Sequence, residues 1–156
     1  MNSTPDFFIR RAVPADQVAW RSLYSGYRNF YGLEPDANVV DTTWNWVADN
    51  QHGMQAFVAE SSAGDLLGLA NARVFPRPSR GRMGVYLDDL FTDPLSRGRG
   101  VAAALLAKLA EFAESENADV VRWITAADNS AARSVYDALA VQTSWVTYDM
   151  PPAASH

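Results

Sequence analysis

The sequence contains no cysteine and only two histidines, His52 and His156. Without cysteine, the chain cannot form a disulfide framework, a thiol nucleophile or a thiolate metal site. One histidine lies in an expected loop and the other ends the chain, so neither Ser–His–Asp catalysis nor a histidine metal site is supported. We therefore expect no metal.

Long apolar runs are also missing. No stretch approaches the ~20 residues that cross a membrane as a helix, and the N-terminus lacks the apolar segment of a signal peptide. The net charge of −5 argues against nucleic acid as a partner and is compatible with a cationic substrate. We expect a cytoplasmic protein that binds neither membrane nor nucleic acid.

The composition is that of a globular protein. The chain has 156 residues, of which 48% are hydrophobic and 20% charged, which predicts a single domain over residues 1–156 with a real core. The tail, residues 151–156, is expected to be disordered. Five Trp, six Tyr and seven Phe indicate a well-filled core or an aromatic-lined pocket.

Residues 87–107 read as a strand, a loop with two glycines and a long helix. Pro94 ends the strand because it cannot donate to a ladder, and Gly98 and Gly100 then open the helix. The bare N–H groups at a helix start attract phosphate, and Arg97 and Arg99 add cationic donors. The stretch predicts a pyrophosphate site.

A dinucleotide fingerprint is the weaker interpretation of this loop. Gly98, Gly100 and Ala103 satisfy a loose GxGxxA. That motif needs its first glycine against the strand end and an acid after the next strand. In this chain several residues separate the strand end from Gly98. The available acid, Asp119, lies before the next apolar run rather than after it. A P-loop is excluded because no Gly-Lys-Ser/Thr follows, and a plain Arg-Gly turn before a surface helix is the structural alternative.

The loop resembles the signature Arg/Gln-x-x-Gly-x-Gly/Ala of the GNAT superfamily of acetyl-CoA-dependent N-acetyltransferases. Arg97, Gly100 and Ala102 match it. Residues 128–136 are similar to the family's Asn-x-x-Ala…Tyr helix, and residues 86–93, YLDDLFTD, to the strand of diamine and small-basic-substrate acetyltransferases. The resemblance covers nearly the whole chain, although Ala140 replaces the glycine that usually follows the tyrosine helix.

The element order agrees with that resemblance. Hydrophobic periodicity predicts strands at residues 7–12, 55–60, 66–75, 83–92, 120–126 and 145–150. Helices are expected after Pro14, after an Asp41 cap, from Val101 and from Asp128 or Asn129. This order predicts an α/β (α+β) fold, the GNAT fold, with a mixed, mostly antiparallel central sheet and helices on both faces.

Two neighbouring acids are the candidates for chemistry. An alkyl amine has a pKa of ~10.4 and must lose a proton before it attacks a thioester, and Asp88 or Asp89 could accept that proton. Neighbouring strand residues point to opposite faces unless a bulge intervenes. The resemblance implies such a bulge, with Asp88 as the base and Asp89 as a charge at the acceptor site. Capping of a loop is the structural alternative for either.

Other roles follow only from the resemblance. The Leu90 N–H would stabilise the oxyanion, Tyr136 would protonate the leaving thiolate, and Asn129 would bind pantetheine; by its apolar helix face alone, Tyr136 would be a core residue. The implied cofactor-binding residues are Leu90, Phe91, Thr92, Arg97, Gly98, Arg99, Gly100, Val101, Ala102, Ala103, Asn129 and Arg133. The implied acceptor-binding residues are Tyr27, Tyr31, Glu34, Asp88 and Asp89.

The expected function is acetyl transfer from acetyl-CoA to a primary amine. The expected acceptor is a basic small molecule of the diamine or polyamine type, or a lysine-type side chain, because Glu34 and Asp36 would add to the two aspartates. Three arginines, Arg77, Arg80 and Arg82, lie in a loop that is either solvated or favours an amino-acid acceptor. A non-catalytic acyl-CoA-binding regulator is a further alternative, and the resemblance is compatible with a homodimer.

Overall fold

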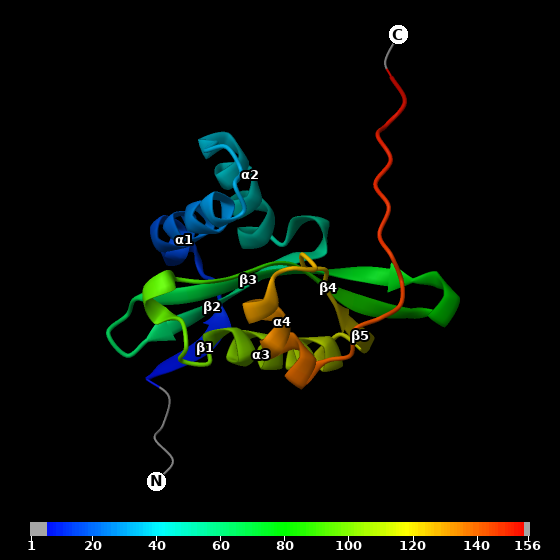
Figure 1. Ribbon diagram of the computed structural model, residues 1–156. Coiled ribbons are helices and arrows are strands. Elements are labelled where there is room, and N and C mark those ends of the chain that lie inside the picture. The colour runs from blue at the N-terminus through cyan, green and yellow to red at the C-terminus, as the bar shows by residue number, and fades with distance from the viewer. Residues whose placement is uncertain (1–5, 155–156) are drawn as a thin grey trace. The chain divides into compact units, whose positions relative to one another are not determined.

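A computed structural model describes residues 6–154, in which one five-stranded sheet has the order β1-β2-β3-β4-β5 (Figure 1). Its strands are β1 (Phe7–Arg11), β2 (Met54–Ser61), β3 (Leu66–Arg77), β4 (Arg82–Thr92) and β5 (Ala118–Arg122). The first four strands pair antiparallel, and β5 pairs parallel to β4. The mixed, mostly antiparallel sheet is confirmed.

Helices cover both faces of this sheet. The α-helices are α1 (Gln17–Phe30), α2 (Ala37–Ala48), α3 (Val101–Ser115) and α4 (Ser130–Leu139), with short 3-10 turns η1 (Pro14–Asp16), η2 (Gln51–Gly53), η3 (Pro78–Arg80) and η4 (Pro94–Ser96). Within residues 6–124, α1 and α2 lie on one face and α3 on the other (Figure 1). Gly68 allows the close approach of α3, because a Cβ there would come within 2.8 Å of the Val101 side chain.

The apolar periodicity of each helix explains which face it buries. Trp20 on α1 is fully buried, and its ring lies 4.8 Å from that of Tyr24 and 5.2 Å from that of Trp44 on α2. On the opposite face, Leu105 and Leu109 of α3 are fully buried. Burial of such side chains stabilises the fold by about 1.5–3 kcal/mol each.

The chain forms two compact units, Met1–Ile124 and Thr125–His156, of which the described parts are residues 6–124 and 125–154. The first contains the sheet and the helices α1 to α3. The second contains α4, whose N-terminus is capped by Asn129 as expected, followed by an extended segment.

The predicted last strand, residues 145–150, is wrong. Within residues 125–154 there is no strand, and Trp145, Tyr148 and Met150 are 83%, 88% and 90% exposed. Alternating β-branched and aromatic residues indicate a segment that could pair, but a strand also needs a neighbour to complete its ladder. The sequence pattern carries no information on that neighbour.

Several boundaries differ from those expected. Helix α2 starts earlier, because Asp36, rather than Asp41, caps it by accepting hydrogen bonds from the N–H groups of Asn38 and Val39. The expected loop at residues 76–82 is shorter than predicted, because β3 extends to Arg77 and β4 begins at Arg82, which leaves η3 and Gly81 as the turn. Strand β5 begins at Ala118. Cap residues and turns shift such boundaries by a few positions.

In the described part of the chain, no helix is long and apolar enough to cross a membrane. Among the same residues, no group of three or more His, Asp or Glu side chains is arranged to hold a metal ion.

Candidate functional site

A β-bulge in β4 places the two neighbouring aspartates together. Asn71 of β3 pairs with Asp89, but the next residue, Ala72, pairs with Leu87, so Asp88 is an extra residue in the ladder. A bulge interrupts the alternation of side chains between the two faces. Asp88 and Asp89 consequently line the same cavity.

This cavity has a volume of about 500 Å³ and lies among α1, α2, η2, β2, β3 and β4. Its lining combines charge with aromatic and apolar surface. The lining residues are Tyr24, Thr43, Trp46, His52, Met54, Arg73, Asp88 and Asp89. Two carboxylates beside aromatic rings form a site that suits an organic cation.

Asp89 is held by hydrogen bonds from two elements. Its Oδ2 accepts one from the Tyr24 hydroxyl at 3.1 Å and another from Asn71 Nδ2 at 3.0 Å. Burial and the Asp89 charge raise the pKa of the Tyr24 hydroxyl, so this group remains a donor at neutral pH.

Asp88 has a different environment. Its Oδ2 is buried and accepts no hydrogen bond in the described structure, although Arg73 Nε lies 3.2 Å away and forms an ion pair. Burial raises the pKa of Asp88 to about 6, with Arg73 opposing the rise and Asp89 adding to it. Such a carboxyl can exchange a proton near neutral pH.

The other expected acceptor residues do not line this cavity. Tyr27 stacks on Tyr24 with ring centroids 5.4 Å apart, whereas Tyr31 is 45% exposed. Glu34 is exposed, and its backbone carbonyl accepts a hydrogen bond from Arg28. The Asp36 carboxylate is used as the α2 cap. The structure thus brings two acids together in the cavity rather than four.

The three arginines of the β3–β4 hairpin lie elsewhere. Arg77 pairs with Asp119, and Arg82 donates to the Asn117 side chain at 3.2 Å. Both contacts are made with the start of β5. Arg73, which no sequence motif indicates, is the arginine that reaches the cavity.

The glycine loop precedes α3 as expected. Gly98 and Gly100 have φ of 77° and 83°, a conformation that favours glycine, and a Cβ on either would meet no atom within 4 Å. Gly100 is the N-cap of α3 and offers no side chain to its first N–H groups. The Arg97 guanidinium stacks 5.1 Å from the Phe30 ring centroid, and Arg99 pairs with Asp6.

The second half of β4 has an open edge. Its pairing with β5 ends at Tyr86, so within the described residues no strand borders residues 87–92 on that side. Backbone groups at such an edge can bind an extended ligand. The edge includes Leu90, the expected oxyanion donor, as well as Phe91 and Thr92.

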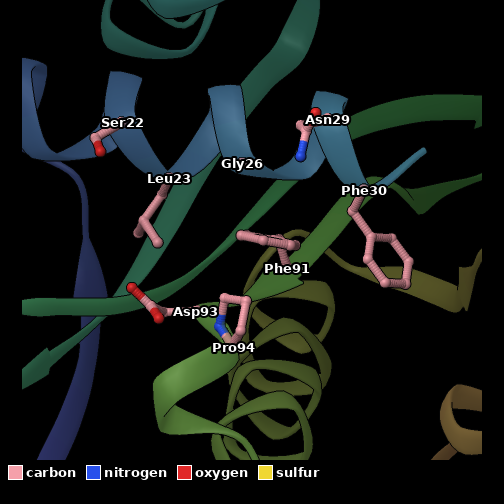
Figure 2. Close-up of a pocket in the computed structure, with 8 residues that line it drawn as sticks. All are labelled: Ser22, Leu23, Gly26, Asn29, Phe30, Phe91, Asp93 and Pro94. Carbon is pink, nitrogen blue, oxygen red and sulfur yellow. The ribbon is translucent and has the colours of Figure 1, made fainter. Parts of the chain in front are cut away.

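Phe91 contributes its side chain to packing rather than to a surface. Its ring is 6% exposed and lies between α1 and Pro94 (Figure 2). Gly26 makes room for it, because a Cβ there would come within 3.1 Å of the ring. A cavity of about 230 Å³ remains beside it. Any cofactor contact of Phe91 would therefore use its backbone.

The expected residues of the second unit lie on or next to α4. Asn129 Oδ1 accepts from the Ala132 N–H, and Arg133 donates to the Ala127 carbonyl at 2.6 Å and to Gln142 at 2.9 Å. Tyr136 lies two turns beyond Asn129 and is partly buried.

Sequence reasoning missed several residues that line the cavity or contact its aspartates. Arg73 and Asn71 are polar residues in an otherwise apolar central strand, which was an available signal. Tyr24 has the periodicity of a core residue, and it is indeed 8% exposed, but its hydroxyl reaches Asp89. His52 lies in an unusual turn with φ of 57° that places its ring against Trp46, and no local pattern indicates this.

Several solved structures share this fold, and some of them are acetyltransferases by name. A probable acetyltransferase superposes with a TM-score of 0.84 at 21% identity, covering 94% of this chain and 99% of its own. A ribosomal-protein-alanine N-acetyltransferase from Brucella melitensis gives 0.80 at 20% identity, covering 93% and 99%. AAC(6')-Iy, in complex with the bisubstrate analogue CoA-S-monomethyl-acetylneamine, gives 0.80 at 20% identity, covering 94% and 99%.

Sequence comparisons define the family. The D-amino-acid N-acetyltransferase HPA3 of Saccharomyces cerevisiae is 25% identical over 141 residues, which are 90% of this chain and 88% of the yeast protein. The model of the acetyltransferase (GNAT) family matches residues 19–140. The chain therefore belongs to the GNAT family of acyltransferases, enzymes that use acetyl-CoA as the acetyl donor.

Proposed function

We propose that this N-acetyltransferase acts on a basic primary amine, which binds in the cavity with its ammonium group against Asp88 and Asp89. The observation that carries the proposal is the bulge, which places two carboxylates in one cavity. A unit charge at about 4 Å contributes ~1–4 kcal/mol near a protein surface. Two such charges favour a diamine, a polyamine or a lysine-type side chain.

Asp88 serves as the general base. It takes a proton from the ammonium group, directly or through water, and its raised pKa brings it closer to that of the amine. The free nitrogen then bonds to the thioester carbon. The carbonyl oxygen gains negative charge, and the N–H of Leu90 stabilises it.

Collapse of this tetrahedral intermediate breaks the carbon–sulfur bond. The nitrogen loses its second proton to water, and the thiolate of CoA leaves and takes a proton from the Tyr136 hydroxyl, which solvent later restores. The proton on Asp88 is released to solvent, so that the products are an amide and free CoA. Asp88 and Tyr136 thus serve as base and acid in turn.

The glycine loop binds the pyrophosphate of acetyl-CoA in this scheme. Gly98 and Gly100 leave the first N–H groups of α3 accessible, and the helix dipole favours an anion there. Arg97 and Arg99 add positive charge, and Val101, Ala102 and Ala103 supply the first helical N–H groups. Leu90, Phe91 and Thr92 offer backbone groups, and for Asn129 and Arg133 of the second unit cofactor binding stays an expectation from the family resemblance.

An amino-acid acceptor is the second candidate. Arg73 lines the same cavity as the two aspartates and could pair with a carboxylate while they bind the amine. The name of the yeast relative, a D-amino-acid N-acetyltransferase, supports this alternative at 25% identity.

A panel of acceptors tests the two candidates. We expect kcat/KM to be highest for spermidine, putrescine or a lysine peptide, and to fall with added salt. Asp89→Asn should lower kcat/KM at least ~10-fold, because it removes the charge that pairs with the ammonium group. Asp65→Asn, which removes the same charge from the exposed β2–β3 turn, should leave kcat/KM unchanged. A preference for amino acids that is lost in Arg73→Gln would favour the second candidate.

A further inference from the structure

The two aspartates of the cavity differ in how firmly they are held. Asp89 Oδ2 accepts hydrogen bonds from Tyr24 and Asn71, at 3.1 and 3.0 Å. Asp88 Oδ2 accepts none in the described structure and has only the ion pair with Arg73 at 3.2 Å. One carboxylate is oriented by two hydrogen-bond donors, and the other by an ion pair alone.

Both donors to Asp89 are buried. Asn71 is fully buried in β3, directly opposite Asp89 at the bulge. Tyr24 is 8% exposed, and its ring packs between those of Trp20 and Tyr27 at 4.8 and 5.4 Å. Because one donor comes from a strand and the other from a helix, they restrain the carboxylate from two directions.

Asn71 is difficult to explain by packing alone. Its neighbours in β3, Ala70 and Ala72, are fully buried, and its own Oδ1 is buried without a hydrogen-bond partner in the described structure. Burial of an unpaired polar atom is destabilising, so an apolar residue would suit this position better. The contact that Asn71 does make is with Asp89.

We propose that Tyr24 and Asn71 are positioning residues that fix Asp89 as the group that binds the acceptor's ammonium, which leaves Asp88 as the group that accepts its proton. This division of roles rests on the proposed function. Both hydrogen bonds end on Asp89 Oδ2, so the proposal assigns the ligand to Oδ1. The Tyr27 hydroxyl, whose pKa is raised by burial and by Asp89, also interacts with this carboxylate. Asp88 lacks comparable donors and stays available for proton transfer.

The charges around Asp88 agree with that division. Arg73 of β3 and Asp89 of β4 act on it with opposite signs, and His52 of η2 and Tyr24 of α1 line the same cavity. Burial is the largest influence and raises the pKa of Asp88 to about 6. Asp88 can therefore change protonation state in the range where the enzyme would work.

A double-mutant cycle tests the positioning role. Tyr24→Phe keeps the ring in the core and removes only the hydroxyl. We expect it to raise KM for spermidine, or for the acceptor with the highest kcat/KM, about 10-fold, since hydrogen bonds to charged groups are strong. KM for acetyl-CoA should not change. In an Asp89→Asn background the same substitution should have no further effect, and Tyr148→Phe, at an exposed site, should have none in either background.

Two further measurements distinguish a failure of this inference from a failure of the proposed function. The side-chain amide signals of Asn71 in a ¹H–¹⁵N spectrum should move in Asp89→Asn and not in Asp65→Asn, whether or not an acceptor is known. The acidic limb of kcat/KM, near pH 6, should persist in Tyr24→Phe and vanish in Asp88→Asn.

Any of three results would overturn the inference. The effects of Tyr24→Phe and Asp89→Asn on KM could prove additive, or the Asn71 amide signals could stay unchanged in Asp89→Asn. The acidic limb of kcat/KM could also depend on Asp89 and persist in Asp88→Asn. If the parent acetylates no amine, the proposed function fails, while the Asn71 signals still report on the contact with Asp89.

Discussion

Asp88 is a partly buried carboxyl whose pKa is about 6 in the folded protein, against ~3.9 in an unfolded chain. Below pH ~4 it is neutral in both states and does not affect folding. Between pH ~4 and ~6 the unfolded state ionises first, so the free energy of unfolding falls as pH rises. Asp88→Asn should therefore stabilise the protein at pH 8 by about 1–3 kcal/mol, and this gain should disappear towards pH 4.

Urea unfolding of both proteins across this pH range measures the difference. Asp65→Asn is the matched control, because Asp65 lies in an exposed turn. The same Asp88→Asn variant should lose most of its acetyltransferase activity. A variant that is less stable than the parent at pH 8 would show that the ion pair with Arg73 outweighs burial.

Tyr136 is the proposed acid for the departing thiolate. Tyr136→Phe keeps the ring and its packing and removes the hydroxyl. We expect kcat to fall about 10²–10⁴-fold, with little change in the melting temperature or in CoA affinity. Steady-state kinetics and calorimetry measure these quantities, and an unchanged kcat would assign Tyr136 a packing role alone.

Part of the site could be predicted from the residue types in the sequence. The rest depends on which residues lie close together in the fold. Asp88 and Asp89 could be identified because two acids in an apolar strand next to a glycine loop are unusual. Arg73 and Asn71 lie more than a dozen positions earlier, and they meet the aspartates only through the β3–β4 register. Long-range pairing of this kind leaves no local pattern in a sequence.

At the scale of elements, the start of α3 is the feature most open to test. Gly100→Glu adds strain at φ 83° and a negative charge at the helix N-terminus. We expect CoA affinity, measured by calorimetry, to fall by at least ~10-fold, since an acidic side chain would occupy the anion site.

Gly64→Glu provides a matched control for that experiment. Gly64 has φ 91° in the β2–β3 turn, and a Cβ there would likewise meet no atom within 4 Å. Its backbone strain is comparable, but it lies outside the loop. Equal losses of affinity in the two variants would show that strain, and not the anion site, accounts for the effect.

Elements with strong periodicity were predicted well, and those that depend on a partner were not. The apolar stripes of α1 and α3 and the runs of β2 to β4 are local signals. Residues 145–150 carry an equally strong strand pattern, yet they are extended and unpaired in the described structure. The sequence predicted Asp41 as the cap of α2, whereas the structure has Asp36. Either acid could precede a helix, so the sequence alone did not distinguish them.

At the scale of the whole molecule, the buried apolar side chains of residues 6–154 all lie between Trp20 and Ala113. Amide hydrogen exchange should therefore be slowest in β2, β3 and β4 and fast throughout residues 141–154, since protection follows hydrogen bonding and burial. Mass spectrometry of peptic fragments measures this. Slow exchange at residues 145–150 would mean that this segment finds a strand partner in solution.

The bulge at Asp88 also has a genetic consequence. Asn71 pairs with Asp89 and Ala72 with Leu87, so removal of the intervening residue would join the two pairs into an uninterrupted ladder. Loss of a single in-frame codon would then delete the proposed base, while the β3–β4 ladder and the loop before α3 would remain intact. By that route, one mutational event could turn the enzyme into a protein that binds acetyl-CoA without using it.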